Sequence, residues 1–215
     1  MLRTRRDKLK DFITFPVRAF VLAGREDRWG LTSRWGLSSL RSERFDYVAR
    51  EVRGYCLDVG CGTYNPFVNK WFSGRGRGID VFQHPGLTPE EVVEDITHFP
   101  FKNAVFDSVT FIANMNHIPE PSRDKELSEA YRCLKQSGNI VVTFGNPLAE
   151  IIIHTMLSRR EDLKRTDGYT EEDDPYYVLD SEIIERLSRA GFKRIRKKYF
   201  LTQWGFNHLF VGWKT

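Results

Sequence analysis

The chain has 215 residues, of which 40% are hydrophobic and 29% charged, enough to bury the core of one large domain. Its 33 basic and 29 acidic residues leave a net charge of +4, too small to indicate a specific nucleic-acid partner. No apolar run approaches the roughly 20 residues of a membrane span, and the basic start lacks the apolar core of a secretory signal. Three cysteines without metal-ligand spacing predict packed, reduced thiols in a cytoplasmic protein without a metal site; they are Cys56, Cys61 and Cys133.

The first 53 residues are expected to form a helical segment that caps the substrate side. Residues 3–24 place apolar side chains at helical spacing among Lys and Arg, which predicts a helix interrupted near Pro16. Such a helix packs on its own domain or lies on an anionic membrane or lipid, and the sequence leaves both open. Residues 25–39 predict a loop, and residues 39–53 predict a second helix that begins at Ser39.

From Gly54 onward, short apolar strands alternate with helices. This alternation predicts a Rossmann-like, doubly wound α/β domain over residues 54–215, with an insertion at about 147–179. We expect a mostly parallel seven-stranded sheet with helices on both faces. The strands are expected at residues 55–60, 76–81, 91–96, 107–113, 139–144, 193–201 and 208–214, and the helices at 66–72, 122–136, 147–160 and 180–190, the last capped by Asp180 and stopped by Gly191.

The turn after the first strand, in LDVGCGTYNP, is the strongest local signal. Gly60 and Gly62 allow a sharp turn and the close approach of a ligand. Asn65 stands where a dinucleotide-binding loop has its third glycine, and it suits the N-cap of the next helix. Asp58 would repel a diphosphate but would suit a ligand with a positive charge.

Two further aspartates follow the next two expected strands. Asp80 ends the second strand, where an acidic side chain accepts hydrogen bonds from ribose hydroxyls, and Asp95 ends the third. Acidic side chains at three successive strand ends favour a nucleoside attached to a cation.

In chain order, LDVGCGT, GID, EDI with FPFKNAVFDSV, NHIPEP and EAYRCLKQSGNIVVTF resemble the class I S-adenosylmethionine-dependent methyltransferases, in particular their small-molecule branch. The resemblance covers about residues 55–144. It implies that the glycine-rich loop wraps the methionine part of S-adenosylmethionine, that acidic residues hold the ribose and the adenine amino group, and that the next loop closes over the cofactor. The matching positions are Asp58, Gly60, Cys61, Gly62, Asp80, Val81, Asp95, Ile96, Ala113 and Asn114.

His117 is the candidate general base, since histidine titrates near neutrality and this one matches a position that faces the site in the family. The alternative is that it only orders its loop. His154 and His84 are weaker candidates for substrate contact. Trp29, Trp35 and the 147–179 insertion either line the acceptor pocket or anchor their segments to the core.

The resemblance therefore implies a methyltransferase with a small-molecule acceptor, and the basic ends of the chain favour a sugar or lipid-linked intermediate. The basic run at residues 193–198 is either a solvated sheet edge or part of a surface that attracts anions. Two other functions stay open: an NAD(P)-dependent oxidoreductase, and a non-catalytic protein that binds S-adenosylmethionine as a scaffold. The acceptor atom and the oligomeric state are not indicated.

Overall fold

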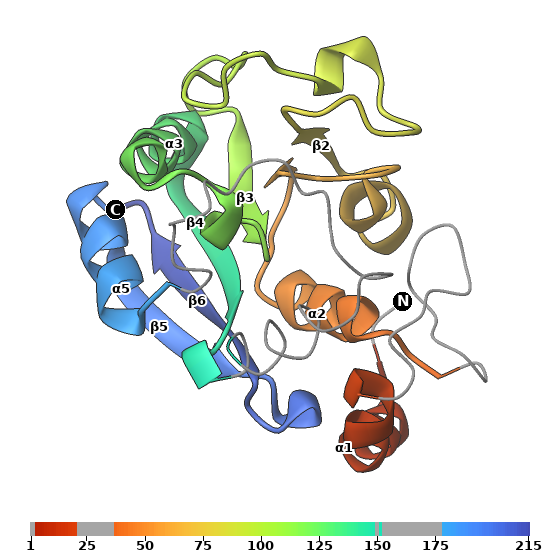
Figure 1. Cartoon of the computed structure of the whole chain (residues 1–215). Coiled ribbons are helices and arrows are strands. Elements are labelled where there is room, and N and C mark those ends of the chain that lie inside the picture. The colour runs from red at the N-terminus through yellow and green to blue at the C-terminus, as the bar shows by residue number, and fades with distance from the viewer. Residues whose placement is uncertain (1–2, 21–36, 149–150, 152–177) are drawn as a thin grey trace.

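The computed structural model describes residues 3–20, 37–148, 151 and 178–215, and shows one sheet between two layers of helices (Figure 1). The six described strands are β1 (Cys56–Val59), β2 (Gly76–Ile79), β3 (Phe106–Ile112), β4 (Leu134–Gly145), β5 (Lys193–Tyr199) and β6 (Asn207–Trp213). The helices are α1 (Arg5–Phe20), α2 (Leu40–Ala49), α3 (Glu120–Cys133) and α5 (Asp180–Arg189), with single turns η2 (Phe67–Trp71), η3 (Pro89–Glu91), η4 (Met115–His117) and η6 (Leu201–Gln203).

The sheet order is β2-β1-β3-β4-β6-β5, and the fold class predicted from the sequence is confirmed. The strands β2, β1, β3 and β4 are parallel, whereas β6 runs antiparallel to both β4 and β5. The chain passes from β1 to β2 on one side and then returns to β3 on the other side of β1. This reversal creates a switch point beyond the carboxyl end of β1, where open α/β sheets bind ligands.

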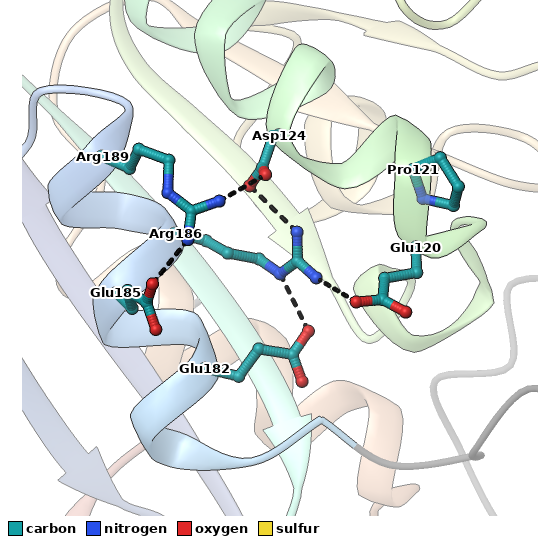
Figure 2. A pocket seen from close by; sticks show the side chains of 7 residues that line it. All are labelled: Glu120, Pro121, Asp124, Glu182, Glu185, Arg186 and Arg189. Atoms are coloured by element: carbon teal, nitrogen blue, oxygen red, sulfur yellow. Dashed lines mark hydrogen bonds and ion pairs between the residues drawn. The ribbon is translucent and has the colours of Figure 1, made fainter.

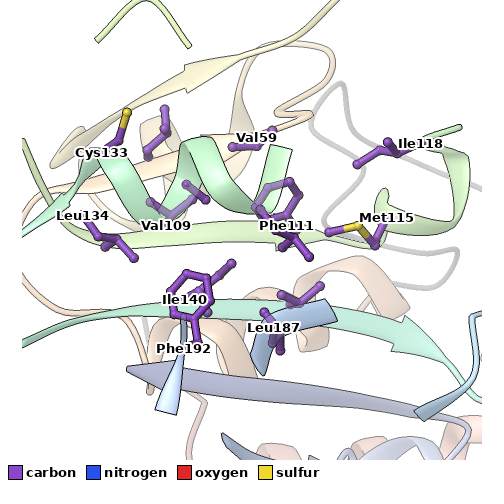
Figure 3. Packing of buried hydrophobic residues seen from close by; sticks show 14 of the residues in the cluster. Val59, Val109, Phe111, Met115, Ile118, Cys133, Leu134, Ile140, Leu187 and Phe192 are labelled. Carbon is purple, nitrogen blue, oxygen red and sulfur yellow. The ribbon is translucent and has the colours of Figure 1, made fainter. Parts of the chain in front are cut away.

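Side chains that alternate along the strands fill two apolar layers. Ile140 and Val142 of β4 belong to the layer covered by α3 and α5, and Val141 between them belongs to the layer covered by α2. Figure 3 shows the first layer, with Phe111 of β3 and Leu187 of α5 among its labelled members. Because both faces of the central strands are covered, β1 is buried at all four positions and β3 at five of its seven positions.

The expected strand at residues 91–96 is not present, so the described sheet has six strands rather than seven. Pro89–Glu91 form a 3-10 turn, and Asp80 and Val92 make a single parallel bridge beside β2. Parallel neighbours need a crossover of about a dozen residues, usually with a helix. The connection from Ile79 contains two prolines and holds that single turn in place of a crossover helix.

The helix α1 continues through Pro16, contrary to the expected interruption. A proline inside a helix leaves the carbonyl four residues earlier without its N–H partner. Here that carbonyl belongs to Phe12, and it accepts a hydrogen bond from the indole Nε1 of Trp204 at 2.9 Å. The replacement donor comes from the far end of the chain, so the local sequence could not predict it.

Of the expected helix ends, the stop at Gly191 is confirmed, and the N-caps at Asn65 and Asp180 are wrong. Gly191 follows α5 with a φ of +105°, and the hydroxyl of Ser39, for which no cap was predicted, caps α2. Asn65 has a left-handed φ of 43°, and its side-chain amide donates to Glu91 rather than to the start of a helix. Asp180 is the first residue inside α5, and Leu179 occupies the N-cap position.

Several predictions concern residues outside the described ranges: the helix at 147–160 with His154, most of the 147–179 insertion, and Trp29 and Trp35. Within the described ranges, no helix has both the length and the apolar character needed to cross a membrane.

Candidate functional site

The glycine loop, residues 60–62, is fixed against the end of β2 by its own backbone. Gly60 and Gly62 have φ values of +69° and +66°, which favour glycine. The N–H groups of Gly60 and Cys61 donate to the carbonyl of Ile79 at 2.8 and 3.1 Å, and Gly62 N donates to Asp80 Oδ2 at 2.8 Å. The turn after β1 and the carboxylate after β2 are therefore joined by hydrogen bonds.

Asn114 brings the loop after β3 to the same place. Its Nδ2 donates to the carbonyl of Val59 at 2.5 Å, and a Cβ added to Gly60 would lie 2.2 Å from this nitrogen. Ala113, with a φ of 54°, donates from its N–H to Thr143 Oγ1 at 3.0 Å. The Oδ1 atom of Asn114 is buried without a hydrogen-bond partner among the described residues, which leaves an acceptor beside the glycine loop.

Asp58 is a buried carboxyl directly before the loop. Its Oδ1 accepts a hydrogen bond from Thr110 Oγ1 at 2.7 Å. Burial raises the pKa of Asp58 to about 7, although the Thr110 hydrogen bond and the nearby Arg41 favour ionisation, and the charge of Asp80 adds to the rise. The carboxyl therefore changes charge near neutral pH and gains most from a cation beside it.

Arg41 is a site residue that the motif reasoning missed. It lies in the first turn of α2, and its Nη2 is 3.6 Å from the place where a Cβ on Gly62 would stand. No other described heavy atom outside the neighbouring residues lies within 4 Å of that place. Because Arg41 precedes Gly62 by 21 residues, only tertiary packing brings this guanidinium to the glycine loop.

Asp80 is buried, and both of its oxygens accept backbone hydrogen bonds. Oδ2 accepts from Gly62, and Oδ1 accepts from Phe82 N at 3.1 Å. The Nε2 atom of His84 lies 3.6 Å from Oδ1, so the histidine considered a weak candidate adjoins the predicted ribose-binding carboxylate. The proline-flanked loop around His84 gave no sequence signal for this contact.

The other predicted nucleoside residues lie next along the chain. Asp95 is exposed and accepts from the backbone and hydroxyl of Thr97 at 2.8 and 2.6 Å; these hydrogen bonds lower its pKa. Val81 and Ile96 pack against the first apolar layer. Glu126 of α3 is buried nearby without a hydrogen-bond partner in the described part of the chain, and burial, then the charge of Asp95, raise its pKa to about 8.

His117 ends η4 after β3, on the loop that carries Asn114. It is partly buried, and its Nε2 is 3.5 Å from Nδ2 of Asn116. His117 therefore lies beyond the carboxyl end of β3, and its catalytic role stays a prediction.

A second histidine, His208, lies at the same edge of the sheet and was not anticipated. It is buried opposite Phe144 near the end of β4, and its Nε2 is 2.9 Å from Asp180 Oδ1. Burial is the main cause of its lowered pKa, followed by the charge of Lys197. The ring is 1% exposed and the Asp180 side chain is 40% exposed, so this pair connects the start of α5 to β6 with its carboxylate at the surface.

An open groove of about 460 Å³ lies between α3 and α5 and is shown in Figure 2. Arg186 bonds Glu120, Asp124 and Glu182 at 2.8 to 3.0 Å, and Arg189 bonds Asp124 at 2.8 Å. The charged groups in the groove are thus engaged with each other, and they hold the two helices together. The three cysteines are also structural in character, since all are free and buried as predicted.

The fold and the site together define a class. The architecture is that of the S-adenosylmethionine-dependent methyltransferases, and residues 57–142 match the family model described as a methyltransferase domain. The chain is therefore similar in fold to these enzymes, and the family model matches its central part. This central part contains the glycine loop and the predicted site residues from Asp58 to His117.

Three solved structures illustrate the similarity of fold. A possible histamine N-methyltransferase from Thermotoga maritima is 16% identical with a TM-score of 0.60, covering 81% of this chain and 89% of that one. A methyltransferase from Archaeoglobus fulgidus is 14% identical with a TM-score of 0.58, covering 82% and 95%. A Haemonchus contortus phosphoethanolamine N-methyltransferase, in complex with phosphomonomethylethanolamine and S-adenosylhomocysteine, is 16% identical with a TM-score of 0.55, covering 80% and 53%. Among curated proteins, no sequence match was found.

Proposed function

We propose that the protein transfers a methyl group from S-adenosylmethionine to a small-molecule acceptor, with a sugar or lipid-linked molecule favoured. The observation that carries this proposal is the hydrogen bond from Gly62 N to Asp80 Oδ2. It lies beside the buried Asp58, at the switch point of the sheet and within the segment that matches the methyltransferase family model. The site offers carboxylates and backbone groups where a cationic nucleoside would lie.

The residues near the glycine loop fit the methionine part of this cofactor. Asp58 supplies a carboxyl that a neighbouring cation would ionise, and Arg41 supplies a guanidinium suited to a carboxylate. The space beside Gly62 and the unpartnered Oδ1 of Asn114 leave room and an acceptor for the ligand. We propose that these four residues hold the amino acid end of the cofactor.

The nucleoside end fits the next two loops. Asp80 would accept hydrogen bonds from the ribose hydroxyls, with Val81 and Ile96 against the adenine and Asp95 as acceptor for its amino group. Asp80 and Asp95 hold their carboxylates through local backbone hydrogen bonds, so their orientation is set before a ligand arrives.

The bound cofactor supplies an activated methyl group on a positively charged sulfur. The protein's task is then to align the acceptor atom with that methyl group, and such orientation accounts for about 7–11 kcal/mol of a barrier in well-placed systems. A base is needed where the acceptor atom carries a proton that must leave, and His117 is the proposed group.

Two alternative functions are disfavoured by particular residues. An NAD(P)-dependent oxidoreductase would need to accommodate a diphosphate beside the buried Asp58, with Asn65 in place of the third glycine. A non-catalytic scaffold would keep the same cofactor contacts, so only turnover separates it from an enzyme.

The test is turnover with an unbiased set of acceptors. The protein is incubated with methyl-labelled S-adenosylmethionine and with separate lipid and sugar extracts, and mass spectrometry follows S-adenosylhomocysteine and the labelled product. We expect stoichiometric formation of both in one extract. Cofactor binding without any S-adenosylhomocysteine above the protein-free control would support the scaffold and contradict the proposal.

The acceptor found in this way permits a test of His117. At saturating S-adenosylmethionine, His117→Gln is expected to lower kcat by about 10²- to 10⁴-fold and to remove the fall in kcat at acidic pH, because the protonated imidazole cannot accept a proton. The exposed His98→Gln is the matched control. An unchanged pH profile in His117→Gln would assign His117 to loop ordering.

A further inference from the structure

The helix α1 buries two charged side chains together with Phe15, and it turns four other apolar side chains toward solvent. Asp11 and Arg18 are 2% and 3% exposed, and Arg18 forms a buried ion pair with Glu43 of α2. The opposite side of the helix carries an apolar stripe at helical spacing, with exposed fractions of 61% for Leu9, 46% for Phe12, 65% for Ile13 and 39% for Val17. A surface helix normally turns its apolar side chains to the core, so four exposed ones on one side of α1 are unusual and call for a binding partner.

The turn η6 extends the stripe at the catalytic edge of the sheet. Leu201 and Trp204 are 71% and 51% exposed, and Trp204 contacts the ring of Phe12 at a centroid distance of 6.1 Å. The turn η6 joins β5 to β6, and the first residue of β6 pairs with Gly145, the last residue of β4. We call Leu9, Phe12, Ile13, Val17, Leu201 and Trp204 the apolar surface.

Positive charges border the apolar surface on α1. Arg5, Arg6 and Lys10 are exposed in the first two turns. Arg6 precedes Leu9 by three residues and Lys10 precedes Ile13 by three, so both cations lie beside the stripe. Aliphatic and aromatic side chains flanked by cations, with a tryptophan at the boundary, are the chemistry of a helix that lies in the interface of an anionic bilayer.

We propose that α1 and η6 dock on an anionic lipid bilayer and that the methyl acceptor is anchored in that bilayer. This inference rests on the proposed function, because it places the carboxyl edge of the sheet, where the glycine loop lies, toward the membrane. Docking would immerse the apolar surface in the outer acyl region while the cations meet the lipid phosphates. An acceptor held in the membrane would then reach the site without leaving the lipid.

The test is flotation of the full-length protein with two vesicle compositions: phosphatidylcholine alone, and phosphatidylcholine with 30 mol% phosphatidylglycerol. We expect at least tenfold stronger partition to the anionic vesicles. The double variant Leu9→Ser, Ile13→Ser is expected to bind the anionic vesicles at least tenfold more weakly than the native protein. Ile184→Ser is the matched control, since Ile184 is an exposed apolar residue of α5 and is expected to bind like the native protein.

Two single variants, Arg6→Glu and Lys10→Glu, test the contribution of the positive charges to vesicle binding. Each is expected to weaken binding about fivefold or more, because a cation near an anionic bilayer contributes about that factor. Lys193→Glu is the control, because Lys193 pairs with Trp213 at the end of β6 that is far from η6. This variant should bind the vesicles like the native protein. Equal binding to both vesicle compositions, or no flotation, would overturn the proposal.

Two further outcomes would also overturn it. Sedimentation that shows a dimer dissociated by Leu9→Ser, Ile13→Ser would assign the apolar surface to a second copy of the chain. A loss of stability to urea comparable to a core substitution would show that the stripe packs within the chain. Calorimetry with S-adenosylmethionine, without vesicles, separates the two proposals: normal binding without flotation rejects only the membrane inference, whereas absent binding rejects the proposed function.

Discussion

At the scale of residues, Asp58 links the charge of the site to pH. Its burial before the glycine loop raises its pKa to about 7, so about half of the carboxyls are ionised at neutral pH in the free protein. A cationic ligand favours the ionised form and would lower this pKa on binding. The affinity for S-adenosylmethionine should therefore rise as the pH increases through 7.

We expect the Kd to be about tenfold weaker at pH 6 than at pH 8, because only about one carboxyl in ten is ionised at pH 6. Calorimetry in buffers of different ionisation enthalpy should also show proton release on binding near pH 7. Asp58→Asn should bind more weakly than the native protein at pH 8 and with no pH dependence over this range. A native Kd that stays constant from pH 6 to pH 8 would contradict the role of Asp58.

Some site residues could be predicted from the local sequence, whereas others reach the site only through tertiary packing. Asp58, Gly60, Gly62 and Asp80 could be predicted from the sequence because each follows a short apolar strand, and parallel strands bring their carboxyl ends together. Arg41 could not, because packing of α2 over the loop creates its contact. The pairing of His208 with Asp180 likewise depends on two segments far apart in the chain.

At the scale of elements, most strands and helices follow from alternation and helical spacing, and the errors have specific causes. The strand expected at 91–96 has the right composition but makes only one parallel bridge, and its connection from β2 holds a 3-10 turn in place of a crossover helix. The break expected at Pro16 is prevented by the indole of Trp204. The predicted helical spacing of α1 was correct, but spacing alone could not show that four of its apolar side chains face solvent.

The buried polar contacts of α1 should determine how tightly this helix is held on the rest of the protein. Arg18 bonds Glu43, donates to the carbonyls of Asp11 and Ser38 at 2.5 and 3.0 Å, and is almost fully buried. Arg18→Ala is expected to destabilise this attachment by about 3–5 kcal/mol, because it leaves the carboxylate of Glu43 buried without its partner. Hydrogen exchange should then accelerate over residues 5–20.

Arg189→Ala is the control for this prediction. Its side chain is exposed and its ion pairs with Asp124 and Glu185 lie at the surface, so urea denaturation should show a change of about 1 kcal/mol or less. Exchange over α1 that is equally slow in the native protein and in Arg18→Ala would show that apolar contacts such as Phe15 with Trp204 hold the helix instead.

At the scale of the whole molecule, the α/β fold places the glycine loop, the loop after β3 and the turn η6 along one edge of the sheet. The cofactor site and the apolar surface of α1 therefore share one side of the protein. This arrangement would place the proposed methyl transfer close to an acceptor anchored in the membrane. Both proposals depend on the central claim that Asp80 and the glycine loop bind S-adenosylmethionine.

Titration calorimetry of the native protein and two matched variants tests this claim most directly. Asp80 Oδ2 accepts from Gly62 N at 2.8 Å at the site, and Asp107 Oδ2 accepts from Tyr55 N at 2.8 Å at the opposite edge of the sheet. We predict saturable binding of S-adenosylmethionine and S-adenosylhomocysteine, no binding of NAD, at least tenfold weaker binding by Asp80→Asn, and native affinity in Asp107→Asn. Binding of NAD in place of the sulfonium, or equal affinity in Asp80→Asn and the native protein, would contradict the account.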